Sequence, residues 1–196
     1  GNLVFNPYSI DDLQKKYKRE PIYTADIIID GNKNESSIEK SKISIRTDGD
    51  GDLKIWAVPN CLKVENRYLV SVDIGGKSST SDYTVMTVID RFDMMPSIKG
   101  KPKVVARWRG HVRHDKLAWM AAALAHYYDD ALLVIESNTA DREKNNNTEG
   151  DHFGSILNEI ADYYDNLYQR TTSPEDVSDD VLAKYGFQTN KLTKGW

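Results

Sequence analysis

Two carboxylates in this sequence, Asp73 and Glu136, each follow directly on an apolar run. Asp73 closes the mostly apolar stretch 67–73, and Glu136 comes after the five apolar residues 131–135. Both runs predict buried strands, the second covered on both faces. If a right-handed helical crossover returns the second strand beside the first, both acids lie at the carboxyl ends of parallel strands, where ligands bind in open α/β sheets.

Such a pair of acids is suited to binding a metal ion. Two carboxylates forced together repel each other, and a shared proton or a bound cation relieves that repulsion. Oxygen ligands without cysteine or clustered histidine favour Mg²⁺ or Mn²⁺. For Asp73 alone, a turn or helix-cap role stays open. That alternative is weaker for Glu136, because glutamate is not a favoured turn residue.

The elements around these acids follow from the hydrophobic periodicity. Residues 67–73, 83–90 and 103–109 are predicted strands, and their short connections indicate an antiparallel meander. A period of 3.6 residues then predicts a helix over 117–128, followed by the strand 131–135. We therefore predict a mixed α/β fold in which three antiparallel strands are followed, after a helix, by a parallel strand, with helices flanking the sheet.

Alternation along 103–109 predicts which side chains share a face of the third strand. Val104, Ala106 and Trp108 fall on one face. Lys103, Arg107 and Arg109 fall on the other. Further along the chain, an apolar stripe over 153–164 predicts a second helix, and 166–169 a short strand.

Residues 1–50 differ from the rest and are predicted to be a β-rich extension or linker that precedes one domain over 51–196. They are rich in Lys, Asp, Asn and Ser, with only short apolar stretches such as the predicted strand 25–29. Residues 42–46 and 52–56 alternate apolar with polar, and 47–51 carries the turn residues of a hairpin between them.

Composition excludes several classes of protein. The 196 residues include no apolar run near the roughly 18 to 20 needed to span a bilayer, so no membrane partner is expected. The lone Cys61 and four scattered histidines offer neither a disulfide nor a structural zinc site, which indicates a reducing compartment. With a net charge of −4, any nucleic-acid binding needs a local basic patch.

Four segments occur in an order that resembles a known family. They are LKIWAVP at 53–59, YLVSVD at 68–73 followed by DYT at 82–84, ALLVIESN at 131–138, and YGFQTNK at 185–191. Together they resemble the nuclease domain of the phage terminase large subunit, which has a ribonuclease H-like fold. The resemblance extends from about residue 52 to the last residue.

The resemblance implies a metal-dependent endonuclease that cuts concatemeric double-stranded DNA by two-metal-ion hydrolysis, with Mg²⁺ or Mn²⁺. Asp73 would bridge both ions, Glu136 would hold one, and Asp82 would support them. The implied partners are double-stranded DNA, the terminase ATPase domain, the small terminase subunit and the portal. The implied location is the cytoplasm of a bacterial host, with the gene carried by a phage or prophage.

One part of the family pattern is missing. The family's third carboxylate follows a helix that should begin after Lys194, whereas this sequence ends at Trp196. The paired acids Asp179 and Asp180 precede the last motif and are interpreted as a solvated helix start. We therefore expect a fragment with an incomplete metal site that is inactive on its own.

The predicted DNA-binding residues are basic or amide side chains near these motifs, which would contact phosphates with little sequence specificity. They are Arg107, Arg109, Arg113, Lys191, Lys194 and Asn138. For each cation the alternative is a solvated surface, and for Asn138 a local turn.

Two further functions stay open. The first is a non-catalytic DNA-docking or assembly module with the same fold and a disabled site. The second is an actin-like or sugar-kinase-like phosphotransferase, because residues 72–76 with the following Ser and Thr resemble the first phosphate loop of that superfamily. Metal-dependent nicking of DNA, or binding of ATP, separates these functions.

Overall fold

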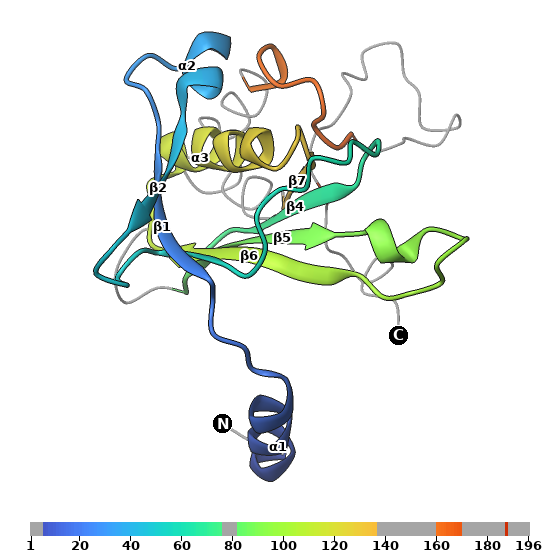
Figure 1. Cartoon of the computed structure of the whole chain (residues 1–196). Helices are drawn as coiled ribbons and strands as arrows, with labels where there is room; N and C mark the ends of the chain where they lie inside the picture. Colours follow the sequence, from blue (N-terminus) through green and yellow to red (C-terminus); the bar gives the residue numbers. More distant parts are fainter. Residues whose placement is uncertain (1–5, 76–81, 137–159, 170–186, 188–196) are drawn as a thin grey trace, which may run out of the picture.

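Alternation of buried and exposed side chains along β4 (Tyr68–Asp73) and β5 (Thr84–Asp90) builds the centre of a mixed sheet. The computed structural model describes residues 6–75, 82–136, 160–169 and 187. Within them a seven-stranded sheet has the order β2-β1-β3-β6-β5-β4-β7. The helices α2 (Glu35–Lys40) and α3 (His114–Tyr127) lie above it in Figure 1.

The antiparallel meander predicted from the sequence is confirmed. β5 lies between β4 and β6 (Lys103–Gly110) and pairs antiparallel with both. Beyond β4, the strand β7 (Leu132–Ile135) pairs with it in parallel. This is the predicted succession of three antiparallel strands, a helix and a parallel strand, which is the arrangement of a ribonuclease H-like sheet.

Helix α3 makes the crossover between β6 and β7 and covers one face of the sheet. Its side chains Leu117 and Leu124 are fully buried, as is Tyr128 just after its end. Four alanines between them are also fully buried, which lets the helix approach the strands closely. The hydroxyl of Tyr128 donates a hydrogen bond of 2.9 Å to the carbonyl of Ala57, linking the helix to the segment after β3.

The N-terminal strands extend the same sheet. β1 (Tyr23–Ile28) pairs antiparallel with β2 (Lys42–Arg46) on one side and with β3 (Leu53–Ile55) on the other. The predicted hairpin between 42–46 and 52–56 is therefore wrong, because β1 occupies the place between those strands. The β-rich extension is present, and the domain boundary at residue 50 stays a prediction.

Glycine is required where the chain re-enters the sheet before β3. A Cβ atom on Gly51 would overlap the backbone nitrogen of Ala25 in β1, so only glycine allows the two segments to pack this closely.

The prediction that Val104 shares a face with Ala106 is wrong, because β6 contains a β-bulge. Val88 pairs with Ala106 while the next residue, Ile89, pairs with Val104, so Val105 is the extra residue. The bulge reverses the alternation before it. Val104 is consequently 53% exposed and lies on the face of Arg107 instead of the buried face of Ala106.

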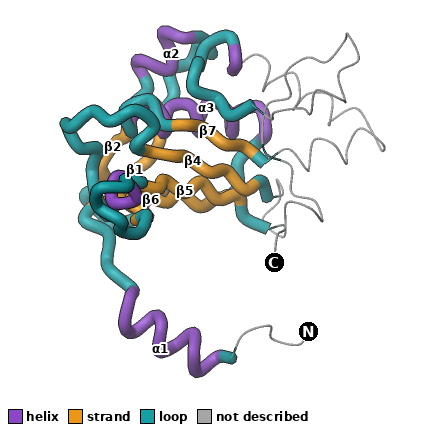
Figure 2. The backbone as a smooth tube through the Cα atoms, turned by 90° about the vertical axis from the view of Figure 1, so that its right-hand side faces the viewer, coloured by secondary structure: helices purple, strands orange, loops and turns teal. Residues whose placement is uncertain are grey.

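The remaining elements are short or lie at the edges. Helix α1 (Pro7–Tyr17) buries no side chain and projects away from the sheet, as Figures 1 and 2 show. Most of the helix predicted over 153–164 lies outside the described residues, although Ile160 and Tyr164 are buried. The strand predicted at 166–169 is represented by a parallel bridge between Leu133 and Leu167.

Among the described residues, no helix has the length and apolar character needed to cross a membrane.

A buried ion pair ties the start of β4 to the end of β5. The guanidinium of Arg67 donates two hydrogen bonds to the Asp90 carboxylate, at 3.1 and 2.7 Å, and packs against the ring of Phe92. Burial opposes ionisation of Asp90. Hydrogen bonds from Arg67 and from the backbone N–H of Phe92 outweigh that effect, so the pKa of Asp90 is lowered from 3.8.

Asp90→Asn should lower the free energy of unfolding by about 3 kcal/mol at neutral pH, because it leaves the buried Arg67 charge without a counter-ion. A carboxyl with a lowered folded pKa stabilises the protein above its unfolded pKa and loses that contribution as the pH falls through the folded value. The difference in unfolding free energy between the wild type and Asp90→Asn should therefore be constant above about pH 5 and should become smaller below pH 3.8.

The measurement is urea denaturation followed by circular dichroism at several pH values. Asp48→Asn is the matched control, because Asp48 pairs with Arg46 at an exposed position and should change stability little. A difference for Asp90→Asn that stays the same down to pH 2 would contradict the proposed role of its carboxylate.

Candidate metal centre

Asp73 and Glu136 end two neighbouring parallel strands. The last paired residues of β4 and β7 are Val72 and Ile135, and the backbone N–H of Glu136 donates a hydrogen bond of 2.9 Å to the carbonyl of Val72. This register brings Asp73 and Glu136 opposite each other, with their strands about 4.8 Å apart. The topological match predicted from the sequence is therefore present.

Both acids belong to the face of the sheet opposite α3. Val72 and Ile135 are buried on the α3 side, at 2% and 0% exposure. Because successive side chains of a strand point to opposite faces, the residue after each of them is directed to the other face. Asp73 is exposed and Glu136 is half-buried, so solvent and ligands have access to this end of the sheet.

Asp82 lies against the chain just after Asp73. A Cβ atom on Gly75 would overlap the backbone carbonyl of Asp82, so the two segments touch. The backbone N–H of Gly75 also donates a 3.0 Å hydrogen bond to the hydroxyl of Thr84, the first residue of β5. The structure thus brings the Asp82 backbone to the end of β4, while its supporting role stays a prediction.

The two carboxylates provide only some of the oxygen ligands that a hard cation such as Mg²⁺ requires. Among the described residues, no three side chains of His, Cys, Asp or Glu gather closely enough to hold a metal ion. Mg²⁺ prefers about six oxygen ligands and commonly takes only one or two carboxylates from the protein. Asp73 and Glu136 thus fit that part of a magnesium or manganese shell.

An aromatic stack beside the acids was missed by sequence analysis. The guanidinium carbon of Arg109 lies 3.7 Å from the ring centroid of Tyr83, and the ring of His111 stacks on Tyr83 at 4.3 Å. Arg109 pairs with Val85, which pairs in turn with Asp73, so the cation lies in the same cross-strand row as the acid. Only the strand register brings these residues together, and their sequence positions contain no signal for it.

The predicted DNA-binding residues are distributed unevenly. Arg107 and Arg109 are exposed in β6 and lie on the face of Asp73. Arg113 is exposed at the residue before α3. The other predicted contacts, Asn138, Lys191 and Lys194, lie outside the described residues.

Comparison with known proteins assigns neither a family nor a function to the chain. No family model and no curated protein matches the chain. Among solved structures, the chain is similar to the large terminase nuclease from thermophilic phage G20c, solved with bound magnesium. The two share 17% identity over 57% of this chain and 47% of that chain, with a TM-score of 0.39. The alignment thus spans about half of that nuclease, and a likeness of this size assigns no function.

Thr84→Val should loosen the loop residues 74 and 75 that follow Asp73. The substitution keeps the shape of the buried side chain but leaves the N–H of Gly75 without its acceptor, at a cost of about 1–2 kcal/mol in unfolding free energy. The direct measurement is hydrogen exchange of the Gly75 amide, which should become faster. Thr84→Ser keeps the hydroxyl and should keep the protection. Equal exchange in both variants would show that this hydrogen bond does not hold the loop.

Proposed function

We propose that this chain is the metal-dependent endonuclease domain of a phage DNA-packaging terminase large subunit, cutting concatemeric double-stranded DNA. The observation that carries the proposal is the parallel register of β4 and β7, in which Asp73 and Glu136 end adjacent strands and share a face. The order of the motifs along the chain supports the specific family.

The arrangement suits phosphodiester hydrolysis. Mg²⁺ or Mn²⁺ would supply an activated water and stabilisation of the leaving oxygen. Of this chain's residues, Asp73 and Glu136 would hold the metal and Asp82 would support them. Arg109, in the same cross-strand row as Asp73, would orient a phosphate of the substrate beside the acids.

The biological setting is part of the same proposal. The ATPase domain of the terminase, the small terminase subunit and the portal are the proposed protein partners, and the cytoplasm of the bacterial host is the proposed location. The family resemblance of the four motifs supports these partners, and they follow only if the nuclease assignment is correct.

A DNA-docking module without catalysis is the second candidate. It is favoured by one observation, that no group of three metal-binding side chains occurs among the described residues. The two candidates differ in whether the chain binds a divalent cation at Asp73 and Glu136, which can be measured without any cleavage.

Asp73→Asn and Glu136→Gln should each abolish cleavage of supercoiled plasmid by the full-length protein in Mg²⁺ or Mn²⁺. Each change removes an anionic ligand at almost constant volume. The loss should therefore exceed the roughly 10- to 100-fold cost of removing an outer-shell partner. The matched controls are Asp48→Asn and Glu39→Gln, which remove exposed carboxylates elsewhere. Cleavage at the wild-type rate in either site variant would refute the assignment.

Binding of Mn²⁺ should stabilise this chain even where cleavage is absent. A ligand present at 100 times its dissociation constant adds about 2.7 kcal/mol to the stability of the folded state, which raises the melting temperature. The rise should be largely lost in Asp73→Asn and Glu136→Gln and kept in Asp48→Asn. A rise of equal size in all variants, or none in the wild type, would favour the docking module.

A further inference from the structure

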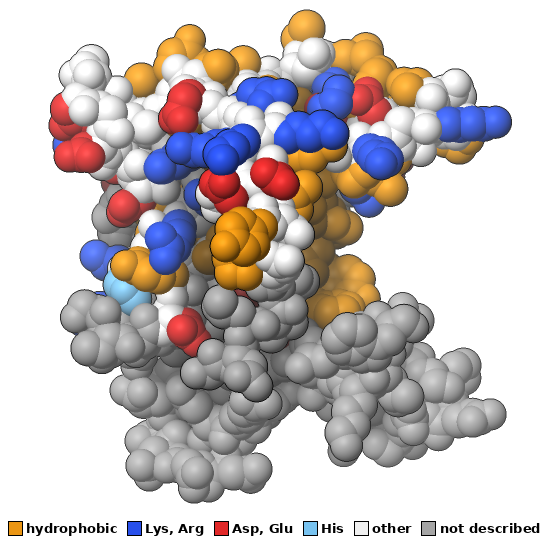
Figure 3. Space-filling model, turned by 90° about the horizontal axis from the view of Figure 1, so that it is seen from below, with side chains coloured by type: hydrophobic (Ala, Val, Ile, Leu, Met, Phe, Trp, Pro, Cys, Tyr) orange, Lys and Arg blue, Asp and Glu red, His pale blue; other side chains and the backbone are white. Residues whose placement is uncertain are grey.

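Three cations on the face opposite α3 have no acidic partner within the described part of the chain. Lys54, Arg107 and Arg109 have no carboxylate within ion-pair distance there. Two other basic residues of the sheet are neutralised, since Arg46 pairs with Asp26 and Asp48, and Lys103 pairs with Asp93. Viewed from below in Figure 3, Lys and Arg side chains gather in a band across this face.

The strand register places two of these cations directly opposite each other. Lys54 of β3 pairs with Arg107 of β6 in the antiparallel ladder. Like charges at such positions destabilise a sheet, typically by a fraction of a kcal/mol. A bound anion would remove that repulsion, whereas an unliganded surface gains nothing from it.

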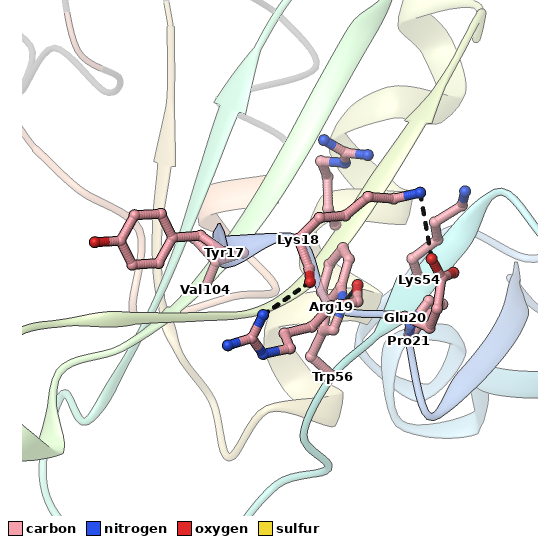
Figure 4. A pocket seen from close by; sticks show the side chains of 9 residues that line it. Tyr17, Lys18, Arg19, Glu20, Pro21, Lys54, Trp56 and Val104 are labelled. Carbon is pink, nitrogen blue, oxygen red and sulfur yellow. Dashed lines mark hydrogen bonds and ion pairs between the residues drawn. The ribbon is translucent and has the colours of Figure 1, made fainter. Parts of the chain in front are cut away.

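The cations line two adjoining hollows, which we call the Trp56 groove. The larger, of about 570 Å³, lies between the segment after α1 and strands β3 and β6, and Figure 4 shows its lining. The smaller, of about 340 Å³, shares Lys54 and Arg107 with it and continues to Arg109 and Tyr83. The groove therefore leads towards the end of β4, where Asp73 lies.

Trp56 is held in a fixed orientation inside the groove. Its indole N–H donates a 2.9 Å hydrogen bond to the backbone carbonyl of Arg19, and the guanidinium of Arg107 lies 6.0 Å from its ring. Arg19 adds a further positive charge to the larger hollow, where Lys18 pairs with Glu20 at 3.2 Å. Asp50 and Asp52 line the smaller hollow, so the five cations of the groove outnumber its three acids. Val104, turned outward by the bulge, supplies an apolar wall.

We propose that the Trp56 groove binds a stretch of nucleic-acid strand away from the acids, with Lys54 and Arg107 on its phosphates and Trp56 against a base or sugar. The inference rests on the proposed function for its substrate but uses residues other than Asp73 and Glu136. Basic side chains interleaved with a fixed aromatic ring are the usual platform for a nucleic-acid strand.

The geometry also gives the distance between this contact and the reaction. Lys54 and Asp73 lie three strand spacings apart and two residues along the strands, which amounts to about 16 Å. At about 3.4 Å per nucleotide step, that span corresponds to roughly five nucleotides. The groove would therefore contact DNA about five nucleotides from the phosphate that is cut.

The test is binding of a fluorescein-labelled DNA duplex in EDTA, followed by fluorescence anisotropy as the salt concentration rises. Without metal, the readout does not depend on cleavage. Lys54→Gln and Arg107→Gln should each weaken binding and reduce the slope of log affinity against log salt by about 0.9, the value for one lost phosphate contact. The matched control is Lys40→Gln, which removes an exposed charge from α2 on the other side of the sheet and should leave the slope unchanged.

Trp56 provides a second, independent variant pair. Trp56→Phe keeps an aromatic face but loses the hydrogen bond to Arg19, whereas Trp56→Leu loses the ring. If the ring stacks on an unpaired base, Trp56→Leu should weaken binding of a labelled single-stranded oligonucleotide about 5-fold or more. Trp56→Phe should stay near the wild type. Thermal melting of each variant verifies that the fold is retained.

Three outcomes would overturn the inference. Equal effects of Lys54→Gln and Lys40→Gln would mean that only the overall charge matters. Wild-type affinity in both Lys54→Gln and Arg107→Gln would mean that the groove does not bind DNA. Binding of polyglutamate to the groove would then indicate an acidic protein partner. Equal loss in Trp56→Phe and Trp56→Leu would mean that Trp56 only holds the segment after α1.

The groove and the nuclease can fail separately. DNA binding that depends on Lys54 in EDTA, combined with no metal-dependent cleavage, would support the groove and refute the nuclease. Cleavage that depends on Asp73, with unchanged binding by Lys54→Gln, would support the nuclease and refute the groove.

Discussion

The parallel pairing of β7 with β4 is the constraint on which the rest of this structure depends. A parallel neighbour cannot be reached by a tight turn, so the chain must cross the sheet between β6 and β7, and α3 makes that crossing. The same pairing brings Asp73 and Glu136, 63 positions apart in the sequence, to one edge of the sheet. Covering one face with α3 then leaves the opposite face for polar side chains.

The two faces of the sheet have different physical roles. The face under α3 is closed by fully buried aliphatic, alanine and aromatic side chains, and it supplies most of the packing energy. The other face contains a cross-strand row that is largely polar, running through Arg46, Thr24, Lys54, Arg107, Thr87 and Ser71. Because stability comes from the first face, the second can place like charges side by side at small cost.

Much of this arrangement could be predicted from the sequence, and the exceptions have physical reasons. The meander, the crossover helix and the parallel strand followed from hydrophobic period and from the handedness of crossovers, which are local or general properties. The prediction of a hairpin over 42–56 was wrong because β1 competes with β3 for pairing with β2. In the structure β1 lies between the two strands. The stack of Arg109, Tyr83 and His111 depends on register between strands, which the composition of each strand does not specify.

The bulge at Val105 has a consequence for how β6 can vary between related proteins. The extra residue interrupts the alternation of side chains along β6. The partners of the residues before it and of those after it are therefore set separately by pairing with β5. An insertion or deletion before Val105 can alter the turn after β5 without rotating Arg107 and Arg109 off their face. Loss of the single residue at 105 would restore a regular ladder and twist the sheet less, while Lys103 and Val104 would keep their present partners, Asp90 and Ile89, and their present faces.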